Sequence, residues 1–197
     1  MAANRNGIKK GTKVRVEPVR KIQDIKSIGK LLKSEPRNLL LWVLGINNGL
    51  RCSDLVPLKV HQLKDLKAGE FFHITERKTG KQNILIVNKS VRKVLDFYLE
   101  QIKPDADDYI FSSRKGSHMS SQSTGRLIKG WTKAINLSGN YGSHTLRKTW
   151  AYQQRVKFHV PIEIITKRLN HSNPAVTMRY VGIEDKEVCD VLLNEIG

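Results

Sequence analysis

Cysteine and long apolar runs are scarce in this sequence, and each scarcity excludes a class of protein. The two cysteines, Cys52 and Cys189, are too few for a disulfide framework and form no CxxC metal-binding pair. We interpret both as small hydrophobic side chains without a function. No stretch approaches the roughly 18 consecutive apolar residues of a membrane-spanning helix, and the N-terminal residues lack the apolar region of a secretion signal. The sequence therefore predicts a cytoplasmic protein with no membrane partner.

Acidic side chains are also scarce, and their scarcity leaves a large excess of positive charge. The chain carries 35 Lys+Arg against 18 Asp+Glu, which gives a formal net charge of +17. A charge of this size favours a polyanionic partner, with nucleic acid preferred over a membrane surface. The 197 residues, 39% of them hydrophobic, suffice for one domain with a packed core.

The pattern of apolar residues predicts a flexible arm followed by one domain. Residues 1–20 are basic with little periodicity, and we interpret them as a flexible N-terminal arm, either a solvated tail or a segment that touches DNA phosphates. Residues 21–197 predict a mainly α fold with a small antiparallel β-sheet (α+β). The sheet is expected as a hairpin over residues 71–87 with Gly80 in its turn. Apolar residues at helical spacing predict helices over residues 21–32, 39–46, 90–102, 127–137, 162–169, 174–180 and 184–196, and a further helix is expected from Thr145 onward. Ser53 or Asp54, and Ser90, are the expected caps of the helices that they precede.

Chemically active side chains stand in the short polar breaks between these elements. Arginines grip a phosphate through paired hydrogen bonds and stabilise the charge that develops when phosphorus becomes five-coordinate. Histidines donate to its oxygens or move protons near neutral pH. A lysine can protonate a departing sugar oxygen, and a tyrosine beside such cations becomes a usable nucleophile. This chemistry needs no metal and no cofactor. The candidate site residues are Arg51, Lys78, His144, Arg147, His171 and Tyr180.

Five short motifs carry these residues, and together they resemble the tyrosine recombinases, the phage integrase family. The matching segments, in chain order, are GLRCSDL (49–55), KTG (78–80), HTLRKT (144–149), LNHS (169–172) and TMRY (177–180). Lys81 borders the same turn as Lys78, so the choice of hairpin lysine depends on the resemblance. Two positions depart from the family pattern, since Asp54 stands where glutamate is usual and Asn170 where glycine is usual.

The resemblance implies a catalytic domain of mostly helical fold that breaks and rejoins DNA. By this comparison Tyr180 attacks a phosphodiester and forms a 3'-phosphotyrosyl link, while Arg51 and Arg147 hold the phosphate. Lys78 is then the general acid, His144 a proton acceptor or phosphate ligand, and His171 a phosphate ligand. Asp54 is expected to brace Arg51.

The same resemblance implies partners and leaves rival functions open. The expected partners are double-stranded DNA, further copies of the chain in a synaptic tetramer, and DNA-bending accessory proteins, with the protein at the nucleoid. Family members commonly carry a helical core-binding domain of roughly 100 residues, and only a basic stretch precedes the catalytic domain in this sequence. The alternatives are a type IB topoisomerase-like activity and a non-catalytic DNA-binding regulator on the same fold.

Overall fold

A long apolar helix, α2 (Pro36–Asn48), forms the centre of the fold. The computed structural model describes residues 15–114, 116–182, 192, 193 and 195. Pro36 occupies the first turn of α2, where its missing N–H costs nothing, and the helix ends at Gly49 in the left-handed conformation (φ 62°). A Cβ at residue 49 would lie 2.5 Å from the ring of Trp150, so only glycine fits this turn. The side chains of Leu40, Leu41 and Leu44 are fully buried.

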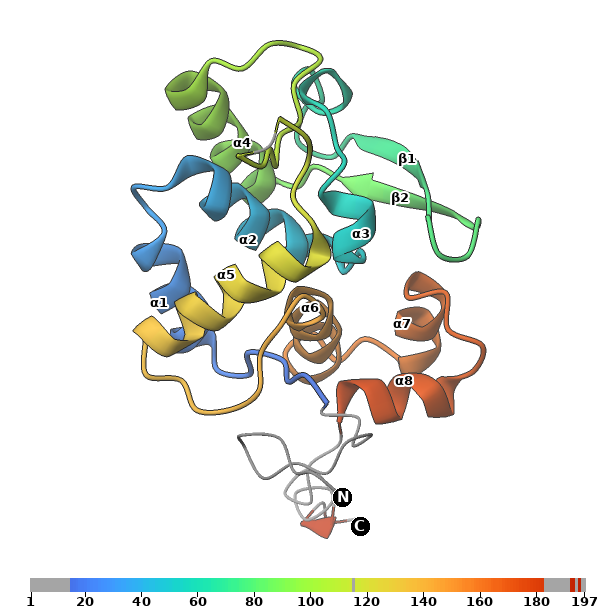
Figure 1. The fold of residues 1–197 in the computed structure, drawn as a ribbon. Helices are drawn as coiled ribbons and strands as arrows, with labels where there is room; N and C mark the ends of the chain where they lie inside the picture. The colour runs from blue at the N-terminus through green and yellow to red at the C-terminus, as the bar shows by residue number, and fades with distance from the viewer. Residues whose placement is uncertain (1–14, 115, 183–191, 194, 196–197) are drawn as a thin grey trace, which may run out of the picture.

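The other elements surround α2 as the sequence predicts: helices pack on one another, and one two-stranded antiparallel hairpin projects from them (Figure 1). Its register pairs Phe71 with Ile86 and Thr75 with Gln82. In chain order the remaining elements are α1 (Ile22–Leu31), α3 (Cys52–Leu55), a 3-10 turn (Val60–Gln62), β1 (Phe71–Thr75), β2 (Gln82–Ile86), α4 (Lys89–Ile102), α5 (Ser121–Ala134), α6 (Thr145–Val156), α7 (Ile162–Arg168) and α8 (Pro174–Val181). The helix predicted over residues 184–196 falls almost entirely outside the described residues.

Two of the predicted helix caps are wrong. The helix α4 is capped by Asn88, whose side chain accepts a hydrogen bond from Val91 N, so Ser90 lies inside its first turn. Arg51 occupies the cap position of α3 without a side-chain cap, which places Ser53 and Asp54 within that helix.

Residues 15–20, which the sequence assigns to the flexible arm, pack against the domain. Val19 is fully buried, and its N–H donates to Thr149 Oγ1 on α6 at 2.9 Å. The backbone of Glu17 accepts a hydrogen bond from Thr145 Oγ1, also on α6. This segment therefore runs beside α6 and brings its own basic residues to that helix.

The carboxyl end of α2 fixes the hairpin. Asn48 pairs with the backbone of Ile86, accepting from its N–H at 2.8 Å and donating to its carbonyl at 3.1 Å. Asn88 Nδ2 donates to Asn47 Oδ1 just beyond the end of β2. The hairpin is thus tied to the same turn that leads into Arg51.

Within the described part of the chain, no helix is long and apolar enough to cross a membrane. The same residues contain no group of three or more His, Cys, Asp or Glu side chains that could hold a metal ion.

Candidate active site

Arg147 is anchored in the turn between α2 and α3. It lies on the first turn of α6, is only 2% exposed, and donates from Nη1 to Gly49 O at 2.8 Å and from Nη2 to Leu169 O at 2.5 Å. Carbonyls at the end of a helix carry partial negative charge, which favours a cation at this place. Burial lowers the pKa of Arg147, but an arginine remains charged at neutral pH. The guanidinium is therefore held in one orientation before any substrate binds.

Arg168, at the end of α7, binds the same turn. Its Nε and Nη2 both donate to Asn48 O, at 3.1 and 2.6 Å, and its Nη1 donates to Asn83 Oδ1 on β2. The guanidinium also lies over the Trp150 ring, 6.0 Å from its centroid. Burial lowers the pKa of Arg168 to about 10. Sequence reasoning missed this residue, because an arginine at a helix end is indistinguishable from a solvated cation until its distant partners are known.

Arg51 is braced by Glu76 and not by Asp54, which corrects the expectation from the resemblance. Arg51 Nη1 lies 2.5 Å from Glu76 Oε2, and the Glu76 side chain is fully buried. Asp54 Oδ1 instead accepts from the backbone N–H of Arg77 at 3.0 Å. Asp54 therefore ties α3 to the hairpin turn, while the carboxylate that faces Arg51 comes from the hairpin itself.

Hydrogen bonds keep Glu76 ionised in spite of its burial. Burial alone would raise the pKa of this carboxyl, but hydrogen bonds from Thr79, Asn83 and Arg51 outweigh it and lower the pKa to about 2. The carboxylate consequently remains charged at neutral and mildly acidic pH. Sequence analysis placed Glu76 in the hairpin turn and gave no reason to separate it from the other charged residues there.

Four of the six predicted site residues line one cavity. It has a volume of about 150 Å³, and its walls include Arg51, Lys78, His144 and Arg147. At about 30 Å³ per water molecule, this is room for about five waters, so a phosphate group fits. Lys78 reaches the cavity from the hairpin, whereas Lys81 is not among the residues that line it.

His171 and Tyr180 form a pair beside Arg147, on the loop after α7 and on α8. Their rings meet edge to face with centroids 5.1 Å apart. His171 Nδ1 is hydrogen-bonded to Thr177 Oγ1 at 2.9 Å, which leaves Nε2 as the ring nitrogen that can reach a substrate. Asn173 caps α8 by accepting from Val176 N and thereby orients the helix that carries Tyr180.

The hydroxyl of Tyr180 is buried close to the Arg147 guanidinium, but it forms no hydrogen bond of ordinary geometry with the described residues. Burial raises the pKa of this phenol to about 12, although the charges of Arg147 and Arg51 oppose that rise. Lys148, the next residue after Arg147, places its Nζ 4.8 Å from the centroid of the Tyr180 ring. The nucleophile candidate is thus surrounded by cations but remains protonated in the protein without DNA.

Both candidate histidines are neutral at pH 7. Burial, followed by the charges of Arg147 and Arg51, lowers the pKa of His171 to about 4. The same causes, in the same order, lower the pKa of His144, which forms part of the cavity wall. A neutral imidazole can accept a proton, so either residue can take the proton of a tyrosine or a water molecule.

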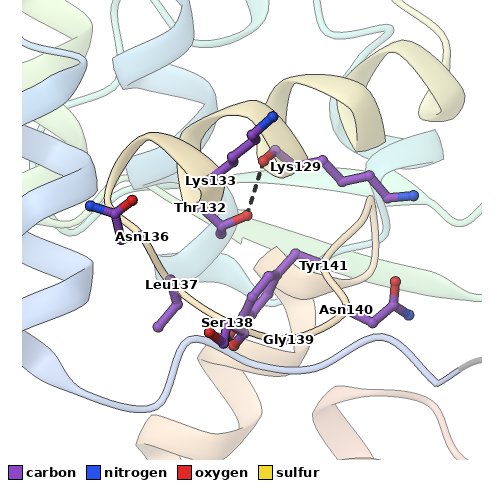
Figure 2. Close-up of a pocket in the computed structure, with 9 residues that line it drawn as sticks. All are labelled: Lys129, Thr132, Lys133, Asn136, Leu137, Ser138, Gly139, Asn140 and Tyr141. Atoms are coloured by element: carbon purple, nitrogen blue, oxygen red, sulfur yellow. Dashed lines mark hydrogen bonds between the residues drawn. The ribbon is translucent and has the colours of Figure 1, made fainter.

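The structure therefore brings all six predicted residues to one region, in two groups that meet at Arg147 and His144. A cavity of about 620 Å³, between α5 and the loop that follows it, lies elsewhere and contains none of the six (Figure 2). The arrangement can hold a tetrahedral anion between two arginines and present a tyrosine beside it. This is the class of site that transfers a phosphoryl group through a covalent tyrosine intermediate.

Comparisons with known proteins agree with this class. The sequence profile of the phage integrase family matches residues 19–187, and the chain belongs to that family. It is 34% identical over 174 residues to the probable integrase/recombinase YoeC of Bacillus subtilis, covering 86% of this chain and 91% of that protein. The crystal structure of XerA recombinase matches with a TM-score of 0.74 at 22% identity, covering 91% of this chain and 67% of that one. XerH, in a post-cleavage complex with its palindromic difH substrate, matches with a TM-score of 0.73 at 19% identity, covering 96% and 58%.

Proposed function

We propose that this protein is a site-specific DNA recombinase that cleaves and rejoins double-stranded DNA through a 3'-phosphotyrosine link to Tyr180. The observation that carries the proposal is the cavity shared by Arg51, Lys78, His144 and Arg147, with the Tyr180 hydroxyl close to Arg147. These four cavity residues come from three parts of the chain, namely the turn after α2, the hairpin and the start of α6, and together they leave a phosphate-sized space.

In the proposed reaction the two arginines bind the scissile phosphate. Arg147 is held by backbone carbonyls and Arg51 by Glu76, so neither guanidinium has to reorganise as negative charge builds on the phosphate oxygens. The Tyr180 oxygen forms a bond to phosphorus, and the bond from phosphorus to the 5' oxygen of the next nucleotide breaks. Lys78 supplies the proton that this leaving oxygen needs, which yields a free 5'-hydroxyl.

Tyr180 must lose a proton before or during the attack. Its pKa of about 12 in the protein alone makes spontaneous ionisation rare at neutral pH. His144 and His171 are both neutral and can accept the proton, and His171 Nε2 can afterwards donate to a phosphate oxygen. Rejoining is the same sequence in reverse, with the 5'-hydroxyl attacking the phosphotyrosine.

Recombination requires two duplexes held together, so we propose that several copies of the chain assemble on DNA, as a tetramer when two sites are paired. The net charge of +17 supports binding to the DNA backbone. Accessory proteins that bend DNA would assist this assembly, and the protein would act at the nucleoid.

The test uses a pool of random-sequence duplexes, each nicked a few nucleotides from a fixed position, so that a cleaved end diffuses away and the covalent complex accumulates. Denaturing gels detect the protein–DNA band, and sequencing of the trapped fragments identifies a preferred duplex. Tyr180→Phe should abolish the band while leaving salt-dependent DNA binding intact.

Three other outcomes separate the rivals. Relaxation of supercoiled plasmid without recombinant products would indicate a topoisomerase-like enzyme. DNA binding with no covalent band from the wild-type protein would indicate a non-catalytic regulator. A covalent band that persists in Tyr180→Phe would remove Tyr180 from the proposal.

A further inference from the structure

A second cavity adjoins the arginine pocket at His144. Its volume is about 430 Å³, and it is lined by three cations, Arg15, Lys148 and Arg179, together with His144, Tyr180 and an apolar floor of two valines. His144 belongs to the walls of both cavities. A strand of DNA whose scissile phosphate occupies the arginine pocket would therefore carry another phosphate past this second cavity.

Among the described residues, the cations of this second cavity form no ion pair with an acidic side chain. Within the described residues Lys148 makes no ion pair, and its ammonium group is instead seated on the face of the Tyr180 ring. Glu17, the carboxylate whose charge acts on Lys148, is itself paired with Arg20 at 3.1 Å. Arg179 Nε reaches only a backbone carbonyl on its own helix, at 3.4 Å. Three positive groups around one hollow repel one another unless an anion joins them.

Lys148 is unusual among these cations because it is buried. Its exposed fraction is 9% although it lies on the first turn of α6, immediately after Arg147. Burial, followed by the charges of Arg15 and Arg20, lowers the pKa of this lysine. A buried cation without a carboxylate costs free energy, and a bound phosphate would recover that cost.

The packed segment at residues 15–20 completes the cavity. Asn140 Nδ2 donates to the carbonyl of Arg15 at 2.9 Å, and Glu17 N donates to Asn140 O at 2.7 Å. These bonds hold the backbone of Arg15 against the loop that precedes α6. The basic residue at the start of the described chain is therefore placed beside the nucleophile by specific contacts and not by charge alone.

We propose that the cavity formed by Arg15, Lys148 and Arg179 binds the phosphate next to the scissile one on the same DNA strand, and that Lys148, through this phosphate, fixes the position of Tyr180. The inference rests on the proposed function. Lys148 is then a positioning residue for the nucleophile: its ammonium bridges a neighbouring phosphate and the face of the ring that must approach phosphorus.

The experiment compares Lys148→Met with wild type on the preferred duplex that the trapping experiment identifies. Two modified versions of this duplex each carry one uncharged methylphosphonate, the first at the phosphate before the scissile one and the second at the phosphate after it. In wild type, one of these two replacements should slow formation of the covalent complex about tenfold. In Lys148→Met the unmodified duplex should react about tenfold more slowly, and the same methylphosphonate should add no further loss. Lys148→Arg should recover most of the rate.

The matched control is Lys157→Met, which removes the same charge at the exposed carboxyl end of α6. It should keep the wild-type rate and the wild-type response to each methylphosphonate. The proposal is overturned if Lys148→Met and wild type are slowed by equal factors at both positions, because the lysine and the phosphate would then act independently.

A second measurement does not depend on cleavage and separates this inference from the proposed function. Inorganic phosphate is titrated into Arg51→Ala protein with isotope-labelled tyrosine rings, after thermal unfolding has confirmed that the variant is folded. The Tyr180 ring signals should shift on binding, and adding Lys148→Met should abolish the shift. Ring signals that respond equally with and without Lys148 would refute the second phosphate site, whether or not the protein cleaves DNA.

Discussion

The two sides of the candidate site differ in how completely their polar groups are paired. On the arginine side, defined by Arg51 and Arg147, the guanidiniums are bonded to Glu76 and to the carbonyls of Gly49 and Leu169. On the tyrosine side, defined by Tyr180 and Lys148, the hydroxyl forms no hydrogen bond of ordinary geometry with the described residues, and the ammonium contacts only a ring face.

This difference indicates that folding alone assembles the arginine side, whereas the tyrosine side is completed by a ligand. Buried polar groups in folded proteins are normally hydrogen-bonded, so the unpaired groups of the tyrosine side mark a place where a partner is expected. The arginine side has internal partners and should contribute to the stability of the free protein. Variants on the two sides should therefore separate stability from chemistry.

The largest effect is expected from Arg147→Ala. It leaves two buried carbonyls without a donor, which should lower the free energy of unfolding by about 2–5 kcal/mol, and it removes a phosphate ligand, which should slow cleavage by about 10²–10³-fold. Urea denaturation and single-turnover trapping measure the two losses. Arg168→Ala is the matched control, since it also frees a carbonyl of the same turn, Asn48 O, but lines neither cavity.

Arg168→Ala should lose comparable stability and retain most of the cleavage rate under conditions where it is folded. Equal loss of cleavage in both variants would show that the carbonyl-lined turn, and not the guanidinium of Arg147, controls the rate. Effects on stability and effects on chemistry could then not be assigned to separate sides of the site.

The Glu76→Gln variant tests whether the arginine side is stabilised by charge. Because hydrogen bonds lower the folded pKa of Glu76 to about 2 from an ordinary value of 4.5, its stabilisation is fully present above pH 4.5 and is lost as the pH falls through 2. Wild type should therefore exceed Glu76→Gln in unfolding free energy by about 3 kcal/mol at pH 7, with a smaller difference at pH 3. Urea denaturation at pH 7 and pH 3 measures the difference in unfolding free energy between the two proteins. A difference that does not change with pH would contradict the ion pair between Arg51 and Glu76.

Much of this site was accessible from the sequence, and the missed parts share a physical cause. Periodicity predicted the helices and the hairpin, and the motif spacing predicted the six candidate residues that the fold gathers. Glu76 and Arg168 were missed because their partners lie far along the chain, 25 residues away for Arg51 and 120 for Asn48. A sequence motif or a helical periodicity covers only a few neighbouring residues and cannot predict contacts between residues so far apart along the chain. The cap of α4 was placed at Ser90 instead of Asn88 because both residues can cap and only the backbone geometry chooses between them.

The His171→Gln variant sharpens the comparison from the tyrosine side. Since burial and neighbouring cations lower the folded pKa of His171 from 6.5 to about 4, its stabilising contribution is present above pH 6.5 and is lost as the pH falls through 4. Wild type should lose about 2 kcal/mol of unfolding free energy between pH 7 and pH 5 from this residue, and His171→Gln should lose less. Nuclear magnetic resonance of the histidine ring should show a midpoint near pH 4. A midpoint near 6.5 would contradict both the burial of this ring and the action of the neighbouring cations on it.

The smallest effect is expected at Asn170, where the loop to His171 adopts a left-handed backbone (φ 50°). Glycine adopts this conformation freely, asparagine tolerates it, and alanine is strained there by about 1 kcal/mol. Both Asn170→Gly and Asn170→Ala remove the amide, so Asn170→Ala should be about 1 kcal/mol less stable than Asn170→Gly in urea denaturation. Asn136, with φ 55° and no place in the catalytic cavities, offers the matched pair Asn136→Gly and Asn136→Ala. Both pairs should show the same stability difference, but only the Asn170 pair should also differ in cleavage rate, because only that loop carries His171. If the two pairs differ equally in cleavage, strain in the loop affects the reaction only through overall stability, and the tyrosine side needs no local order before DNA binds.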